Sequence, residues 1–149
     1  MRLHRELDLE DCVFFLGAQP FTFVLDEYRN AEIFVLPCVV ARQGGRDISP
    51  NALIEAMAMK LPVISTAIAA IPEIVEDGVS GVLVPPNDEN ALAGAMIRLI
   101  NDHDLRGKLG ENARIRVEER FDINNNSVKY VDLFLGEKKF RLTNLSAQS

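Results

Sequence analysis

Short apolar runs alternate with amphipathic stretches along most of the chain. The four runs are Val13–Leu16, Ile33–Leu36, Val63–Ser65 and Val82–Val84. Because these runs are almost wholly apolar, they predict short strands that are buried on both faces. Strands interleaved with helices indicate an α/β fold with a Rossmann-like parallel sheet, covered by helices on both faces and containing about four strands.

Helices are predicted between and after these runs. Apolar residues recur at helical spacing within Pro20–Arg29. Further helices are expected over Pro50–Met59, around Ile71–Glu76, and after Asp122. Asp88 is a favourable N-cap for a helix with Leu92, Met96 and Leu99 on one face. Another helix carries Leu105, Leu109, Ala113 and Val117 on every fourth residue.

Length and charge narrow the class of protein. The 149 residues are enough for one ordinary domain with a real core. The net charge of −6 argues against nucleic acid as a partner, because nucleic-acid binders present a positive field to phosphates. We find neither a signal peptide nor an apolar run of roughly eighteen residues, so we expect a cytoplasmic protein. Cys12 and Cys38 fit reduced structural thiols, and the isolated His4 and His103 make a His-based metal site unlikely.

Two acids stand out in the stretch from residue 44 to residue 73. On one helix, Asp47 and Glu55 would lie roughly 12 Å apart, too far to share one small ligand group. Pro50 disfavours helical geometry at Ser49, so the helix is expected to begin near Pro50–Asn51, with Asp47 in the preceding loop. A loop acid and a helix acid can then meet the same ligand.

The expected helix start can itself bind a ligand. The unpaired amides of Asn51, Ala52 and Leu53 would point toward this ligand, and a helix start is a natural phosphate site. Sugar hydroxyls combined with a diphosphate would use all of these groups. From spacing alone, however, Asp47 also fits a solvated loop or turn acid. Glu55 likewise fits an acid that the helix dipole stabilises.

Several linked motifs carry a family resemblance. The segment D-I-S-P-N-A-L-I-E-A-M-A, followed by LPVIST and IPEIVEDGVSGVLVPPND, resembles the donor-binding half of GT-B glycosyltransferases of the large retaining family four. The resemblance extends from about Cys12 to Phe121. It implies that Asp47 contacts the transferred sugar and is the catalytic residue, while Glu55 hydrogen-bonds the nucleotide ribose. Lys60 departs from the pattern, because a glycine often follows this helix.

The resemblance implies further site residues. Ser49 and Pro50 join Asn51, Ala52 and Leu53 in the donor site. Apart from the resemblance, the turn at Gly17–Ala18 follows the carboxyl end of a predicted strand, where nucleotides bind in such sheets, and is a candidate contact for the base. The implied enzyme needs no cofactor and no metal, and its donor is a nucleotide-sugar. Its acceptor is a glycan, a lipid or a small molecule held by another domain. Ala69 and Ala70 occupy a turn that often contains glycine in this family.

The same resemblance predicts an incomplete domain. Residues 1–136 would form part of the C-terminal GT-B domain, with 137–149 as a polar, frayed tail. The first two strand–helix units would precede Met1, so an upstream segment or a partner chain would complete the sheet, and the isolated chain would be inactive. The full-length enzyme is expected in the cytoplasm or peripherally at the inner face of the membrane. The alternatives are a non-catalytic nucleotide-binding or interaction module, and a nucleotide-sugar epimerase.

Overall fold

The structure is a computed structural model that describes residues 2–39, 51–123 and 127. By its internal contacts the chain divides into two compact units, Met1–Asn30 and Ala31–Ser149. The first unit contains helix α1 (Arg2–Glu6) and helix α2 (Phe21–Asn30). α2 begins where the amides of Phe23 and Val24 bond to the Pro20 carbonyl. The helix predicted over Pro20–Arg29 is therefore confirmed.

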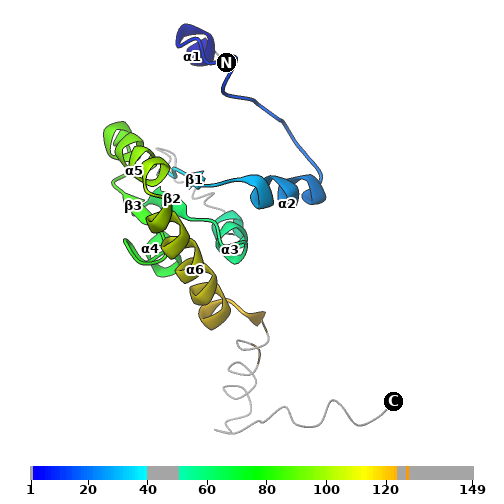
Figure 1. The fold of residues 1–149 in the computed structure, drawn as a ribbon, viewed down its shortest axis with the longest axis vertical. Coiled ribbons are helices and arrows are strands. Elements are labelled where there is room, and N and C mark those ends of the chain that lie inside the picture. The colour runs from blue at the N-terminus through cyan, green and yellow to red at the C-terminus, as the bar shows by residue number, and fades with distance from the viewer. Residues whose placement is uncertain (1, 40–50, 124–126, 128–149) are drawn as a thin grey trace, which may run out of the picture. The chain divides into compact units, whose positions relative to one another are not determined.

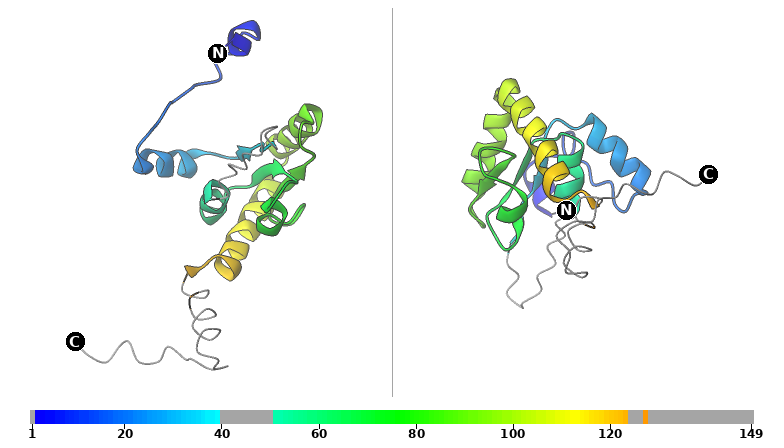
Figure 2. Two further views of the ribbon diagram at one scale, coloured as in Figure 1. Left: turned by 180° about the vertical axis from the view of Figure 1, so that it is seen from behind. Right: turned by 90° about the horizontal axis from the view of Figure 1, so that it is seen from below.

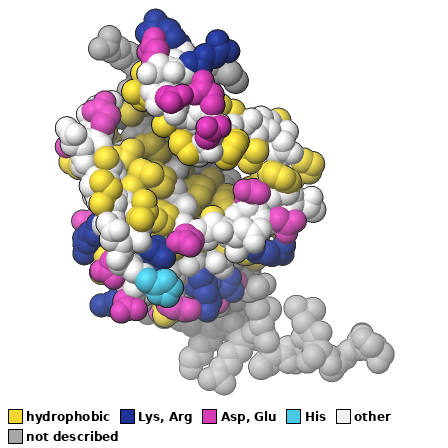
Figure 3. All heavy atoms as spheres, turned by 45° about the horizontal axis from the view of Figure 1, so that its top comes forward, with side chains coloured by type: hydrophobic (Ala, Val, Ile, Leu, Met, Phe, Trp, Pro, Cys, Tyr) yellow, Lys and Arg dark blue, Asp and Glu magenta, His cyan; other side chains and the backbone are white. Residues whose placement is uncertain are grey.

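The strand predicted at Val13–Leu16 is wrong. This segment has no regular secondary structure, and its Phe14 and Phe15 side chains are 71% and 61% exposed. A strand needs a neighbour to bond its main-chain groups, and the strands in the described part of the chain pair only with one another. Many hydrophobic side chains also reach the surface on the face drawn in Figure 3.

The second unit holds a three-stranded parallel sheet (Figure 1). Its strands are β1 (Phe34–Leu36), β2 (Val63–Thr66) and β3 (Val82–Val84), in the order β1-β2-β3. Val35 stands opposite Ile64, and Ile64 opposite Val82. The predicted parallel α/β sheet is confirmed, with three strands among the described residues in place of the four expected.

Four helices of this unit follow the predicted order. They are α3 (Asn51–Ala58), α4 (Ile71–Ile74), α5 (Glu89–Asn101) and α6 (His103–Arg120). Asp88 caps α5 as expected, because its carboxylate accepts the Ala91 amide at 2.8 Å. The Asp102 carboxylate does the same for α6 by accepting the Leu105 amide at 2.9 Å. The helix expected after Asp122 falls almost entirely outside the described residues.

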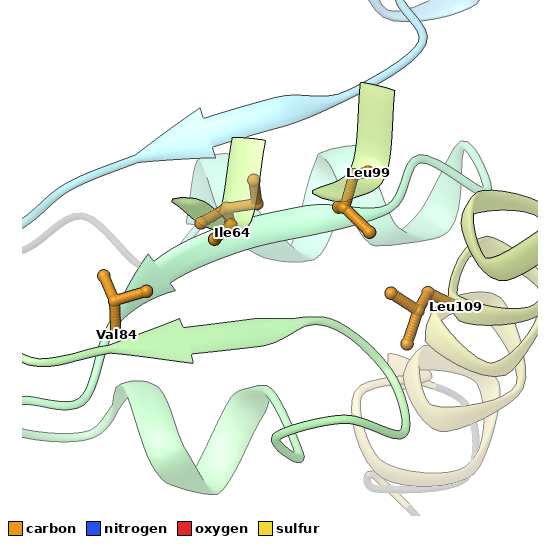
Figure 4. Packing of buried hydrophobic residues seen from close by; sticks show 5 residues of the cluster. Ile64, Val84, Leu99 and Leu109 are labelled. Carbon is orange, nitrogen blue, oxygen red and sulfur yellow. The ribbon is translucent and has the colours of Figure 1, made fainter. Parts of the chain in front are cut away.

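Helices cover both faces of the sheet (Figures 1 and 2). On one face, Ile64 and Val84 pack with Leu99 of α5 and Leu109 of α6 (Figure 4). Side chains alternate along a strand, so the buried Val63 lies on the opposite face. There α3 contacts β1 and β2, with Leu53, Ala56 and Met57 fully buried.

One residue that was predicted to be buried is exposed in the structure. Met96 was expected on the buried face of α5, but its side chain is 38% exposed. The buried residues of α5 are Ala95 and Leu99. Successive residues of an α-helix lie about 100° apart around its axis, so Met96 falls beside the buried face that Ala95 and Leu99 define.

Helix α6 ties the other helices together through three arginines. Their guanidinium groups donate to main-chain carbonyls in the final turns of three helices, where intrahelical partners are lacking. The contacts are Arg106 with Leu99 (2.7 Å) and Ile100 (2.8 Å) of α5, Arg114 with Ala58 (2.7 Å) of α3, and Arg116 with Ile74 (2.6 Å) and Glu73 (3.1 Å) of α4. α6 therefore caps α5, α3 and α4 in turn.

The end of α3 explains why a glycine is usual after this helix. Lys60 has φ +63°, in the left-handed region. Its amide bonds to the Met57 carbonyl, and the Leu61 amide bonds to the Ala56 carbonyl, both at 3.1 Å. This is the Schellman arrangement, in which the left-handed position favours glycine.

Lys60→Gly is expected to raise the free energy of unfolding by about 0.5–1 kcal/mol. Glycine adopts the left-handed conformation without the steric cost that a Cβ brings. The gain is reduced because the substitution removes the exposed ion pair between Lys60 and Glu111, whose atoms lie 2.9 Å apart. Urea unfolding measures the change. The control is Lys108→Gly, at an exposed position within α6, which should lower the free energy of unfolding by about 1 kcal/mol. If Lys60→Gly also lowers the free energy of unfolding, the interpretation is contradicted.

Candidate functional site

The start of α3 lies at the carboxyl edge of the sheet. α3 follows β1 and leads into β2, its parallel neighbour, so the helix runs back across the sheet from the carboxyl ends of the strands to their amino ends. At the far end, the Phe34 amide bonds to the Pro62 carbonyl just before β2 begins. The first-turn amides of Asn51, Ala52 and Leu53 therefore lie at the edge where ligands bind in α/β sheets.

Glu55 is half-buried on the same helix, between the half-buried Ile54 and the fully buried Ala56. Leu53 is fully buried against the sheet, so its main-chain amide is the group that it offers to a ligand. Asn51 is exposed and Ala52 is half-buried. One helix thus brings four of the predicted donor-site residues together: Asn51, Ala52, Leu53 and Glu55.

The structure assigns no position relative to α3 to the other predicted site residues. Asp47, Ser49 and Pro50 lie outside the described residues. Gly17 and Ala18 belong to the first unit, where Gly17 has φ +67° and Ala18 lies in a bend. Their parts in donor binding stay predictions.

A cavity of about 280 Å³ opens at the carboxyl ends of all three strands. Pro37 and Val39 line it after β1, Thr66 at the end of β2, and Val84 and Pro85 at the end of β3. Val84 lies at the tip of β3 (Figure 4). The walls are mainly apolar, and Asn87, Asp88 and Glu89 add polar groups before and at the start of α5. Sequence reasoning missed this cavity, although the prolines that directly follow two strands could have indicated it.

The end of β2 fixes the chain beyond β1. The buried Thr66 hydroxyl accepts the Cys38 amide at 3.1 Å and donates to the Cys38 carbonyl at 2.7 Å. The neighbouring Ser65 hydroxyl donates to the Leu36 carbonyl at 2.7 Å. Two successive side chains of β2 therefore hold Leu36 and Cys38 by their main chain.

A second cavity, of about 500 Å³, lies between α3, α4 and the end of α6. Ile54, Ala70, Glu73 and Phe121 are among its lining residues. The turn before α4 contains Ala69 with φ +47°, again in the region that favours glycine. Glu73 is exposed in the first turn of α4, on the rim of this cavity.

The Cys38 thiol, between Pro37 and Val39, is not activated as a nucleophile. Burial raises the pKa of the Cys38 thiol above its usual value, so this thiol is protonated at neutral pH. In residues 2–39, 51–123 and 127, no group of three His, Cys, Asp or Glu side chains is placed to hold a metal ion. No described helix combines the length and apolar character needed to cross a membrane.

Comparison with known proteins identifies relatives in both sequence and structure. The sequence profile of a family described as glycosyl transferases group 1 matches residues 1–102. The amylovoran biosynthesis glycosyltransferase AmsK of Erwinia amylovora is 40% identical over 115 residues, covering 77% of this chain and 28% of AmsK.

Two solved structures share the fold. Sucrose-phosphate synthase from Thermosynechococcus elongatus superposes with a TM-score of 0.77 at 32% identity, over 91% of this chain and 32% of that chain. HepE from Anabaena, solved in complex with UDP-glucose, superposes with a TM-score of 0.75 at 24% identity over 35% of its length, a likeness that shows the fold. The chain spans about a third of the length of these proteins, or less.

Proposed function

The chain belongs to the glycosyl transferases group 1 family, and from this premise we propose that it forms the donor-binding part of a retaining glycosyltransferase. The observation that carries the proposal is the half-buried Glu55 on a helix that starts at the carboxyl edge of the parallel sheet. An acid at this place can accept hydrogen bonds from the hydroxyls of a nucleotide ribose. The HepE complex with UDP-glucose supports the same ligand class on this fold.

The start of α3 would bind the donor diphosphate. The amides of Asn51, Ala52 and Leu53 lack intrahelical partners by their position, and the helix dipole places partial positive charge beside them. Donors aimed at the diphosphate stabilise the charge that gathers there as the bond to the sugar breaks. The helix start therefore assists departure of the nucleotide diphosphate.

Asp47 would act on the transferred sugar. In the proposed reaction the bond from the anomeric carbon to the diphosphate oxygen breaks, a bond to an acceptor hydroxyl oxygen forms, and the hydroxyl proton passes to the departing nucleotide diphosphate. A carboxylate hydrogen-bonded to the sugar orients the ring and stabilises positive charge on the anomeric carbon. Other parts of the full protein would supply the acceptor site and basic groups for the diphosphate, since this chain spans 28–32% of its relatives.

A second candidate is a non-catalytic interaction module. The exposed apolar side chains of Phe14 and Phe15 favour it, because a large exposed apolar run is typical of a surface that another segment covers. A nucleotide-sugar epimerase would share the donor site but would release a changed sugar nucleotide.

Calorimetric titration tests the proposal. UDP-glucose, UDP-N-acetylglucosamine and GDP-mannose are added separately to the chain, with free glucose as the control ligand. We expect saturable binding of one nucleotide-sugar and none of glucose. Absence of binding for all three would leave the interaction module as the better account. Product analysis after incubation with the bound nucleotide-sugar and an acceptor distinguishes sugar transfer from epimerisation.

A further inference from the structure

The hydroxyl of Thr66 makes two hydrogen bonds to one residue of another segment. It accepts from the Cys38 amide and donates to the Cys38 carbonyl, at 3.1 and 2.7 Å. Thr66 is only 3% exposed, so these bonds form in a place where water replaces them poorly. The Thr66 side chain thus makes the hydrogen bonds to Cys38 that the main chain of a neighbouring strand would otherwise make.

The main-chain pairing of β1 with β2 extends to Leu36, which stands opposite Ser65. Continuing the register in which Leu36 stands opposite Ser65 would place Pro37 opposite Thr66. Groups at alternate residues of a parallel strand face the same neighbour, and the Phe34 amide, which bonds to the Pro62 carbonyl, shows that positions 34, 36 and 38 face β2. Just after β2, the Ala67 amide faces the other neighbour and bonds to the Val84 carbonyl of β3 at 2.9 Å. Beyond the last pair of the β1–β2 register, the Thr66 hydroxyl bonds to both main-chain groups of Cys38.

The residues on either side of Cys38 form a wall of the strand-end cavity. Pro37 and Val39 line this cavity together with Thr66 itself, Val84 and Leu92. In the sequence, Val39 leads directly to residues 40–50, which include Asp47. The Thr66 hydroxyl therefore holds the main chain of the residue between the two that form this wall.

We propose that Thr66 is a positioning residue for nucleotide-sugar binding, which acts by holding Pro37–Val39 at the carboxyl edge of the sheet. The inference rests on the proposed function, because it assigns a role to Thr66 in that same donor site. Thr66 does not touch the donor; it fixes the segment that borders it. Removing the hydroxyl should loosen this segment and weaken donor binding, whereas keeping the hydroxyl should preserve both.

The test combines thiol labelling with donor binding. In a Cys12→Ser background, Cys38 is the only thiol, and its rate of reaction with iodoacetamide reports how freely the Pro37–Val39 segment opens. Thr66→Val removes the hydroxyl at nearly constant shape, and Thr66→Ala removes it without placing a methyl group beside the Cys38 carbonyl. Thr66→Ser keeps the hydroxyl. Ser80→Ala is the control, because it removes a buried hydroxyl that accepts the Glu76 amide at 2.9 Å, away from this segment.

We expect Thr66→Val and Thr66→Ala to react at least fivefold faster at Cys38 and to bind the nucleotide-sugar at least fivefold more weakly. Thr66→Ser and Ser80→Ala should stay within twofold of the parent chain in both measurements. If the parent binds the donor and the valine and alanine variants bind equally well, the positioning role is refuted and the proposed function stands. Equal weakening by Ser80→Ala would also refute it, since general destabilisation would then explain the loss. A parent that binds none of the three nucleotide-sugars refutes the proposed function itself, and the role of Thr66 with it.

Discussion

Replacement of Gly110 by alanine is expected to lower the free energy of unfolding by about 3 kcal/mol. A Cβ atom built at this position of α6 overlaps with the main-chain carbonyl oxygen of Lys60, at the end of α3. A main-chain atom fixed in a helix end cannot move aside as a flexible side chain can. α6 must then shift away from α3, which strains the contact that holds the two helices together, and overpacking of this kind costs about 1–3 kcal/mol or more.

The same helix provides the control for this prediction. Gly107 lies one turn earlier on α6, and nothing stands within 4 Å of a Cβ built there. Gly107→Ala should raise the free energy of unfolding by about 0.5–1 kcal/mol, because alanine is the better helix former. Urea unfolding of both variants gives the two changes. If the two variants change the free energy of unfolding by similar amounts, α6 does not lie against the Lys60 carbonyl.

Glu55→Gln is expected to weaken nucleotide-sugar binding at least tenfold. The change keeps the shape of the side chain but removes the charge that strengthens its hydrogen bonds to ribose hydroxyls. Hydrogen bonds to a charged group contribute about 1.5–3 kcal/mol, which corresponds to roughly 10- to 150-fold in the dissociation constant. Calorimetric titration with the nucleotide-sugar that binds the unmodified chain measures the effect.

Glu111→Gln is the matched control for Glu55. It also removes one negative charge, but it lies on α6, where its exposed carboxylate contacts Lys60 at 2.9 Å. An amide oxygen can keep that hydrogen bond. Binding by Glu111→Gln should stay within twofold of the unmodified chain. Equal affinity of the two variants would exclude Glu55 from the donor site.

The strands were predictable where their partners lie within the described chain. Ile33–Leu36, Val63–Ser65 and Val82–Val84 all become strands, because each apolar run finds a parallel neighbour and a helix to cover it. Val13–Leu16 has the same pattern and does not become a strand. An apolar run records a tendency to be buried, but it does not record whether a neighbouring strand is present to bond its main chain.

The donor-site helix was predictable for local reasons, and the cavity beside it was not. Pro50 and the apolar spacing indicated the start of α3 to within one residue of Asn51. The strand-end cavity and the bonds from Thr66 to Cys38 join residues 28 positions apart in the chain. No local pattern reveals such a contact. The left-handed conformation of Lys60 was only partly predictable. It explains why glycine is usual at this position, but a lysine in the sequence does not indicate a left-handed residue.

The central claim is that a nucleotide-sugar binds at the start of α3, and amide chemical shifts test it most directly. Titration of UDP-glucose or GDP-mannose into isotope-labelled chain is followed in two-dimensional NMR spectra. The account predicts that the largest shifts fall on the amides of Asn51, Ala52 and Leu53, with smaller ones on Cys38 and Val39. Largest shifts at Ala70 and Phe121, around the cavity between α3, α4 and α6, with none at the start of α3, would contradict it.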